Sequence, residues 1–311
     1  PFFSGPSTPL VVKNEDQTRW IMLLLGAVYC VLGFAVVMLG RHHVDEGYYH
    51  LIGHLTGQGR LPYRDYFYVQ TPVYPFVYGF LMRFFGSSLL MARGYSLLFS
   101  LMTFMLAVRV ARKASENGRS TASVITALLI VSQPFTLYYL GIIKLYALTS
   151  LVLTAIVAVL TTRWNVTVRF SIAAALAAFA ICIRLTVLPA LPMVILLGAI
   201  RSGKDRWKQT IVASVCSGAL VMLLIMGPWL IISPDKFGYS ILGYHLDKEG
   251  FSLARQLFHR LDTVLKVSSL YPTLAVICGL AVLRRLNDIP GTVRKIFRAD
   301  IRGVTDPGGF T

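Results

Sequence analysis

The feature that most constrains this chain is a succession of apolar segments, each about long enough to cross a lipid bilayer. A transmembrane helix needs about 20 mostly apolar residues. The segments that meet or approach this length are residues 20–40, 88–108, 121–140, 142–162, 168–183, 186–200, 209–233 and 267–283. Only 14% of all residues are charged, against about 25% in soluble domains. The sequence therefore predicts an all-α, polytopic integral membrane protein with about eight spans.

Two stretches depart from simple spans. The fifth and sixth segments are short, and the break between them, from Arg184 to Pro189, predicts a tight helical hairpin. Residues 72–85 are apolar but too few to cross, and this stretch carries Pro72 and Pro75 near its start. We expect it to lie at the membrane interface or to re-enter the membrane.

Positive charges predict the orientation, because Lys and Arg are enriched in short cytoplasmic loops. The rule places both ends inside: residues 1–19 form an N-terminal segment, 20–285 the transmembrane core, and 286–311 a basic C-terminal segment that could be truncated. The long loops 41–87 and 234–266 then face outward. The expected location is the plasma membrane of a prokaryote.

The chain lacks the patterns of a disulfide framework, a zinc site or a nucleic-acid-binding module. Its cysteines lie within apolar runs without CxxC spacing, at positions Cys30, Cys182, Cys216 and Cys278. The net charge is +16, but no basic stripe with interleaved aromatic residues accompanies it. Positive charge beside apolar spans is what membrane topology requires.

The predicted orientation gathers titratable residues on the outer side. All six histidines and half of the 14 acidic residues fall there, namely His42, His43, His50, His54, His245, His259, Asp45, Glu46, Asp65, Asp235, Asp247, Glu249 and Asp262. A purely structural membrane scaffold has no need for this sorting. The outer side is therefore where a functional site is expected.

The first outer loop is expected to contain a helix from Asp45 to Gly57. Asp45 suits the N-cap position, which is its structural alternative to a functional role. Glu46, His50 and His54 recur every four residues and share one helix face. That face could bind a divalent metal or simply point to water, so no metal or other cofactor is assigned.

Several motifs in this region resemble the opening of a known enzyme family. They are Asp45-Glu46-Gly47-Tyr48-Tyr49, Gly59-Arg60-Leu61-Pro62-Tyr63-Arg64-Asp65-Tyr66, Gln70-Thr71-Pro72, Phe85-Gly86 and Ala92-Arg93. The combination resembles the family 39 glycosyltransferases, which are dolichyl-phosphate-mannose-protein mannosyltransferase-like enzymes of the GT-C superfamily. Weaker similarity continues through Lys144-Leu145-Tyr146, Arg184 and Tyr244-His245 to about residue 265. Members of the family are usually longer.

The resemblance implies a GT-C-type core that transfers a sugar from a polyprenyl phosphate. The sugar would be a mannose-like hexose or another hexose or pentose, and the acceptor a hydroxyl of a protein, lipid or glycan on the outer face. By similarity, Asp45 would be the general base. Glu46 would position the acceptor or share a metal.

The implied reaction also needs cations for the leaving phosphate and side chains for the substrates. Lys144, Arg184 and Arg93 are the candidate phosphate contacts, although a cation near a span end could instead anchor the helix at the interface. The candidate substrate contacts are Tyr48, Asp65, Gln70 and His245. For Asp65 an ion pair with Arg64 is the structural alternative, and for His245 a solvated loop position.

Two other functions fit an apolar chain of this kind. One is a transporter or lipid flippase, but the sequence shows no internal repeat and its charged residues lie at the predicted boundary. The other is a non-catalytic subunit of a cell-envelope glycan assembly. A sugar-transfer assay with a polyprenyl-phosphate donor separates the three.

Overall fold

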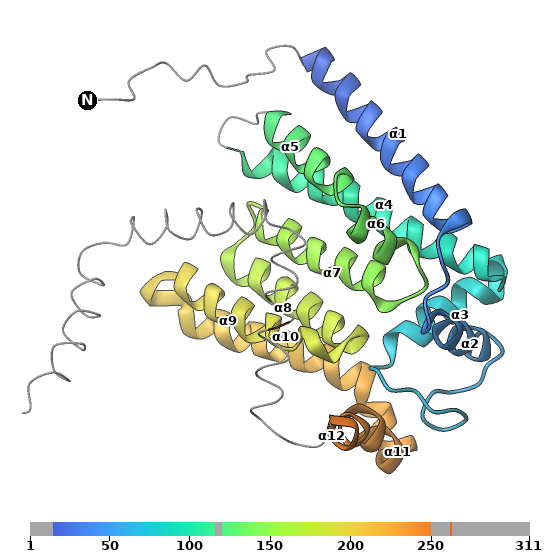
Figure 1. The fold of residues 1–311 in the computed structure, drawn as a ribbon. Helices are drawn as coiled ribbons and strands as arrows, with labels where there is room; N and C mark the ends of the chain where they lie inside the picture. The colour runs from blue at the N-terminus through green and yellow to red at the C-terminus, as the bar shows by residue number, and fades with distance from the viewer. Residues whose placement is uncertain (1–14, 116–119, 250–261, 263–311) are drawn as a thin grey trace, which may run out of the picture. The chain divides into compact units, whose positions relative to one another are not determined.

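The computed structural model describes residues 15–115, 120–249 and 262, and these residues are helical apart from turns and one isolated bridge between Pro62 and Tyr66 (Figure 1). The all-α class is therefore confirmed for this part of the chain. The chain divides into two compact units, residues 1–245 and 246–311. The described residues 15–115 and 120–245 belong to the first unit, and residues 246–249 and 262 belong to the second.

Four helices of the described residues are long and apolar enough to cross a membrane. They are α1 (Glu15–Leu39), α4 (Leu89–Ala114), α8 (Val166–Ile183) and α10 (Gly203–Ile232). Their many exposed leucines and other large apolar side chains would be costly in water, which supports an integral membrane protein. The finer count of about eight spans stays a prediction.

The predicted span 121–140 is broken. It forms α5 (Ser120–Val131) and α6 (Pro134–Gly141), whose axes differ by 74°. Pro134 lies at the start of α6, where its missing N–H costs nothing, whereas inside one continuous helix it would clash with the preceding turn. The pair is either one bent span or a re-entrant segment, which brings the possible total in the described residues to five.

Other predicted spans form shorter helices. The segment 142–162 forms α7 (Leu145–Leu160), with 16 residues, and 186–200 forms α9 (Ala190–Arg201), with 12 residues. The predicted hairpin is confirmed: α8 ends at Ile183, a 3₁₀ turn covers Leu185–Val187, and α9 returns against α8.

The end of the described chain contains three short elements after α10. They are α11 (Pro234–Gly238), the π-helical turn η2 (Tyr239–Gly243) and α12 (Tyr244–Glu249). The predicted span 267–283, the segment 286–311, and most of the second outer loop beyond residue 249 lie outside the described residues.

The first loop is helical, as predicted. It contains α2 (Glu46–Gly57) and α3 (Val73–Phe85), which pack on each other. Glycine permits the contact, because a Cβ on Gly57 would lie 2.9 Å from the carbonyl oxygen of Gly79. The apolar segment 72–85 is thus a separate helix of 13 residues, too short to be a span.

Buried tyrosines fix the connection between α2 and α3. Tyr63, Tyr68 and Tyr74 are at most 1% exposed. The hydroxyl of Thr71 donates a hydrogen bond to the carbonyl oxygen of Ile181, at 2.8 Å. This bond holds the loop against the end of α8, directly before Arg184.

Candidate functional site

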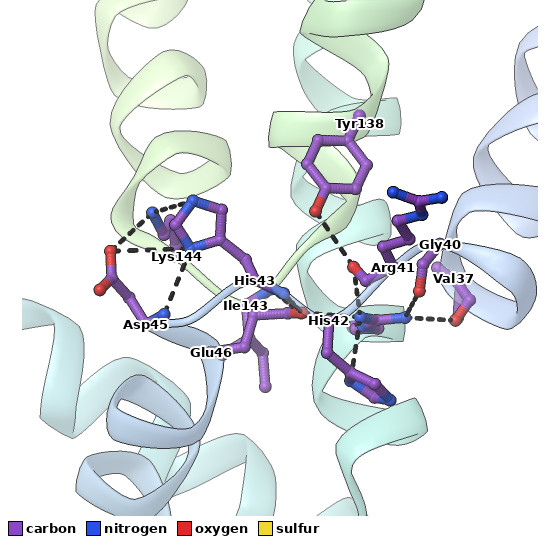
Figure 2. Close-up of polar contacts among 11 residues, drawn as sticks. Val37, Gly40, Arg41, His42, His43, Asp45, Glu46, Tyr138, Ile143 and Lys144 are labelled. Atoms are coloured by element: carbon purple, nitrogen blue, oxygen red, sulfur yellow. Dashed lines mark hydrogen bonds and ion pairs between the residues drawn. The ribbon is translucent and has the colours of Figure 1, made fainter.

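A buried ion pair lies where the chain leaves α1. The Glu46 side chain is 1% exposed and the Arg93 side chain 2% exposed, and their closest oxygen–nitrogen distance is 2.6 Å. The second Glu46 oxygen accepts from Arg93 Nε at 2.9 Å. Backbone N–H groups of His43 and Ile143 also donate to the carboxylate (Figure 2). Glu46 thereby joins α2, α4, the α1–α2 connection and the segment before α7.

Arg93 also satisfies the open end of α1. It donates to the carbonyl oxygens of Val37, Gly40 and Arg41 at 3.0 to 3.3 Å. The last carbonyls of a helix have no partner within the helix, and a cation is favoured there. A single arginine therefore supplies hydrogen bonds to the carbonyl groups at the end of α1 and also neutralises Glu46.

The electrostatics of Glu46 agree with a permanently charged pair. Burial raises the pKa of its carboxyl, but the hydrogen bonds from Arg93, His43 and Ile143 lower the pKa by more, so that it lies below its ordinary value. Glu46 therefore stays ionised at neutral pH.

Two expectations are corrected by this arrangement. Arg93 is not a contact for the donor phosphate, because its guanidinium is buried and already bonded to Glu46 and to three carbonyls. Glu46 is not placed to hold an acceptor, because both of its oxygens accept protein hydrogen bonds out of solvent. The pair stabilises the fold around the site.

Asp45, one residue earlier, lies in a different environment. Its side chain is 53% exposed, and one of its oxygens lies 2.8 Å from Lys144 Nζ. Lys144 is nearly buried and also lies 3.2 Å from His43 Nε2 (Figure 2). A solvent-accessible carboxylate is thus held in place by a shielded cation from another part of the chain.

Asp45 occupies the N-cap position of α2, as expected, but its side chain makes no capping hydrogen bond. The Asp45 side chain therefore does not act as a helix cap, which was the structural alternative to a functional role. Its carboxylate is directed to Lys144 and His43 instead.

Arg184 joins this group through an aromatic ring. Its guanidinium carbon lies 4.7 Å from the centroid of the Tyr146 ring, and Lys144 Nζ lies 5.6 Å from the same centroid. Arg184 Nε is buried and has no hydrogen-bond partner among the described residues. Two cations therefore share one aromatic ring, and one of them has a donor that no other described residue uses.

Tyr49 links the same groups electrostatically. Burial raises its pKa well above the ordinary value, Asp45 raises it further, and Arg184 opposes the rise. These effects place Asp45 and Arg184 both within electrostatic range of the Tyr49 hydroxyl. The structure thus brings together three of the predicted site residues, Asp45, Lys144 and Arg184, from segments far apart in the sequence.

The remaining candidates have other surroundings. Tyr48, whose pKa burial raises to about 12, accepts a hydrogen bond from the Val69 N–H and donates to the Phe67 carbonyl. Asp65 pairs with Arg64, whose hydrogen bonds are the main cause of an Asp65 pKa of about 2. These contacts match the structural alternative for Asp65. The two hydrogen bonds of the Tyr48 hydroxyl tie α2 to the loop at Phe67 and Val69.

The structure gives little information on the side chains of Gln70 and His245, the other two candidate substrate contacts. The Gln70 carbonyl accepts a hydrogen bond from the Tyr63 hydroxyl, and its side chain is half-buried. The backbone of His245 lies in α12, and its side chain lies outside what the structure describes.

The metal-binding face considered for Glu46, His50 and His54 is not formed. Glu46 is bonded to Arg93, His50 donates to the Ser87 carbonyl at 2.6 Å, and His54 contacts the Gln58 side chain. Within the described ranges, no three His, Cys, Asp or Glu side chains are arranged to hold a metal ion. The four-residue spacing does place the three side chains along one helix, α2, but each of them has another partner.

The sequence did not identify His43 or Tyr146 as site residues. His43 contacts Asp45 and Lys144, and Tyr146 lies beneath Lys144 and Arg184. For Tyr146 a signal existed, because it stands two residues after Lys144 in one of the resembling motifs. For His43 only its place beside the acidic pair could have pointed to it.

No family model, curated protein or solved structure significantly matches this chain.

Proposed function

We propose that this protein is a membrane glycosyltransferase that moves a sugar from a polyprenyl-phosphate donor to an acceptor hydroxyl. One observation carries the proposal: an accessible carboxylate, Asp45, lies beside two clustered cations, Lys144 and Arg184, at the ends of apolar helices. The resemblance of the surrounding motifs to family 39 glycosyltransferases supports the same reading.

The cations suit the phosphate of the donor. Lys144 is shielded from water, which strengthens its attraction to an anion. Arg184 has an unused Nε donor among the described residues. As the bond between the sugar and the phosphate breaks, its electron pair passes to the phosphate oxygen, and fixed cations stabilise that charge.

Asp45 suits the general base. Without donor, its carboxylate neutralises Lys144 at 2.8 Å. A bound phosphate can replace Asp45 as the counter-ion of Lys144, which leaves the carboxylate able to accept a proton. The acceptor oxygen then forms a bond to the anomeric carbon, and its proton passes to Asp45.

The position of the site at helix ends suits a lipid-linked substrate. Asp45 follows α1 closely, Lys144 immediately precedes α7, and Arg184 immediately follows α8. We propose that these helix ends lie at the outer boundary of the membrane, with α7 and α9 completing a GT-C-type core of about eight spans. The lipid tail would then remain in the bilayer while its phosphate reaches the cations.

The proposed orientation predicts which positions an impermeant thiol reagent can reach in intact cells. In a cysteine-free background, cysteine at Gln58 or Asp247 should be labelled, because both positions are exposed and assigned to the outer side. Cysteine at Ser202, between α9 and α10, should be labelled only after the cells are lysed. Labelling of Ser202→Cys alone in intact cells would reverse the orientation.

The cation assignment predicts a loss of donor affinity. Lys144→Ala and Arg184→Ala should each weaken binding of a polyprenyl-phosphate sugar by about 10- to 100-fold, since a charge-assisted contact is worth about 1.5–3 kcal/mol. Arg184→Lys should recover part of the loss, because lysine keeps the charge but not the planar fork. Binding can be measured in detergent by titration with the donor.

Arg169 provides a matched control. It lies in α8, the helix that Arg184 immediately follows, but near the opposite end of that helix, with its guanidinium carbon 5.3 Å from the centroid of the Phe170 ring. Arg169→Ala should leave donor affinity unchanged. If the Arg184, Lys144 and Arg169 variants all bind the donor equally well, Arg184 and Lys144 are membrane anchors and not phosphate contacts.

The direct test of the proposal is a sugar-transfer assay with polyprenyl-phosphate sugars and purified protein in lipid. Transfer that depends on Asp45 supports the glycosyltransferase. Movement of the intact lipid across the bilayer without transfer would instead support a flippase.

A further inference from the structure

A second site lies at the other end of α1, away from Asp45. A groove with a volume of about 930 Å³ runs between α1 and α4 and reaches Ser123 of α5. The two helices contact each other and run in opposite directions (Figure 1), so the beginning of α1 meets the end of α4. Nothing in the proposed transfer reaction uses this groove.

The groove is apolar along most of its length. One face of α1 contributes Leu23, Gly26 and Cys30, and one face of α4 contributes Leu101 and Met105. Leu23 is 56% exposed and Met105 is 60% exposed. Such side chains call for an apolar occupant, which hydrocarbon chains of the bilayer can supply.

One end of the groove is cationic. Arg19 of α1 and Arg109 and Arg112 of α4 line this end, and Asp16 is the single acidic residue among the lining residues. The guanidinium groups therefore outnumber the carboxylate, and this end favours an anion. Both helices place their arginines at their termini, where the hydrocarbon region of a membrane gives way to headgroups.

The dimensions match one lipid leaflet. Arg19 and Cys30 are 11 residues apart on α1, as are Leu101 and Arg112 on α4. At ~1.5 Å per residue this separation is about 16 Å, and half of a ~30 Å hydrocarbon core is about 15 Å. An occupant with its charge at the arginines would reach the middle of the bilayer at Cys30.

From this combination we infer that the groove binds an anionic glycerophospholipid of the leaflet at the N-terminal end of α1. The phosphate lies among Arg19, Arg109 and Arg112, and an acyl chain lies along the apolar length between α1 and α4. A zwitterionic lipid fits the apolar part equally well but lacks the net negative charge that the arginines favour.

Native mass spectrometry of the detergent-purified full chain can test the headgroup contact, with phosphatidylglycerol and phosphatidylcholine as probes. The unchanged protein should retain phosphatidylglycerol in preference to phosphatidylcholine. Arg109→Gln and Arg112→Gln should each reduce the retained phosphatidylglycerol by about fivefold, the effect of one cation near an anionic lipid. Arg201→Gln is the control, since Arg201 is an exposed arginine at the end of α9 outside the groove. Equal retention of both lipids would overturn the inference.

A second variant tests the acyl-chain contact by filling the groove. A Cβ on Gly26 meets no atom within 4 Å, so Gly26→Leu can extend into the hollow without a clash. Leucine also favours a helix over glycine, so the variant should fold and lose most of the bound phosphatidylglycerol. Gly227→Leu is the matched control, because Gly227 of α10 is equally open.

The same spectra distinguish the rival occupants. A folded Gly26→Leu protein that retains phosphatidylglycerol as well as Gly227→Leu does would overturn the inference. A dimer that only Gly26→Leu dissociates, without loss of lipid, would assign the groove to a second copy of the chain.

Discussion

Replacing Asp45 with asparagine should lower sugar transfer by about 10²- to 10⁴-fold, the usual contribution of a general base. Asparagine keeps the size of aspartate and an oxygen that can still accept a hydrogen bond from Lys144, but it cannot take up the acceptor proton. Because the Asp45 side chain makes no capping bond to α2 and is 53% exposed, the variant should fold. The measurement is the transfer rate per folded molecule in lipid.

Donor binding separates this loss from a damaged site. The Asp45 carboxylate competes with the donor phosphate for Lys144, so Asp45→Asn should bind donor as tightly as the unchanged protein or more tightly. Asp65→Asn is the control, since Asp65 is a loop carboxylate paired with Arg64. Near-normal transfer by Asp45→Asn would remove the general-base assignment.

Replacing Glu46 with alanine should instead damage the fold. The change leaves the guanidinium of Arg93 buried without its carboxylate, and breaking one partner of a buried ion pair costs about 3–5 kcal/mol. It also leaves the N–H groups of His43 and Ile143 without an acceptor. We expect a lower yield of folded protein and a lower melting temperature in detergent. The melting temperature of Glu46→Gln should lie between those of Glu46→Ala and the unchanged protein, because the glutamine oxygen still accepts a hydrogen bond.

An exposed pair provides the control for this prediction. Asp65→Ala removes the partner of Arg64 at the surface, where solvent screens the charge, and should leave the melting temperature almost unchanged. Transfer by Glu46→Ala should fall only in proportion to the folded fraction. A fully folded Glu46→Ala protein with reduced transfer would return Glu46 to the substrate site.

The contrast between Asp45 and Glu46 has a geometric cause. They are adjacent in the sequence, but successive residues at the start of a helix point about 100° apart. The Asp45 side chain is partly exposed and is directed to Lys144, whereas the Glu46 side chain is directed to Arg93 in the interior. An acidic pair in the sequence thus becomes one accessible carboxylate and one structural ion pair.

The sequence by itself determined the features that depend on local pattern. The apolar lengths predicted membrane-crossing helices, and α1, α4, α8 and α10 have that character. The helical first loop and the hairpin near Arg184 followed from helix signals and prolines close in the chain. Pro134 was also a visible signal for the break between α5 and α6, but the apolar run around it concealed the 74° bend.

Only the tertiary structure decided how distant residues are paired. Arg93 and Glu46 are separated by 47 positions and Lys144 and His43 by 101, and no local pattern specifies such contacts. Burial then fixed their roles, because an ionised group removed from water must be paired and hydrogen-bonded, whereas an exposed one can exchange its partner. The sequence therefore supplied the candidate residues, and packing determined that Glu46 and Arg93 stabilise the fold while Asp45, Lys144 and Arg184 remain together at an accessible site.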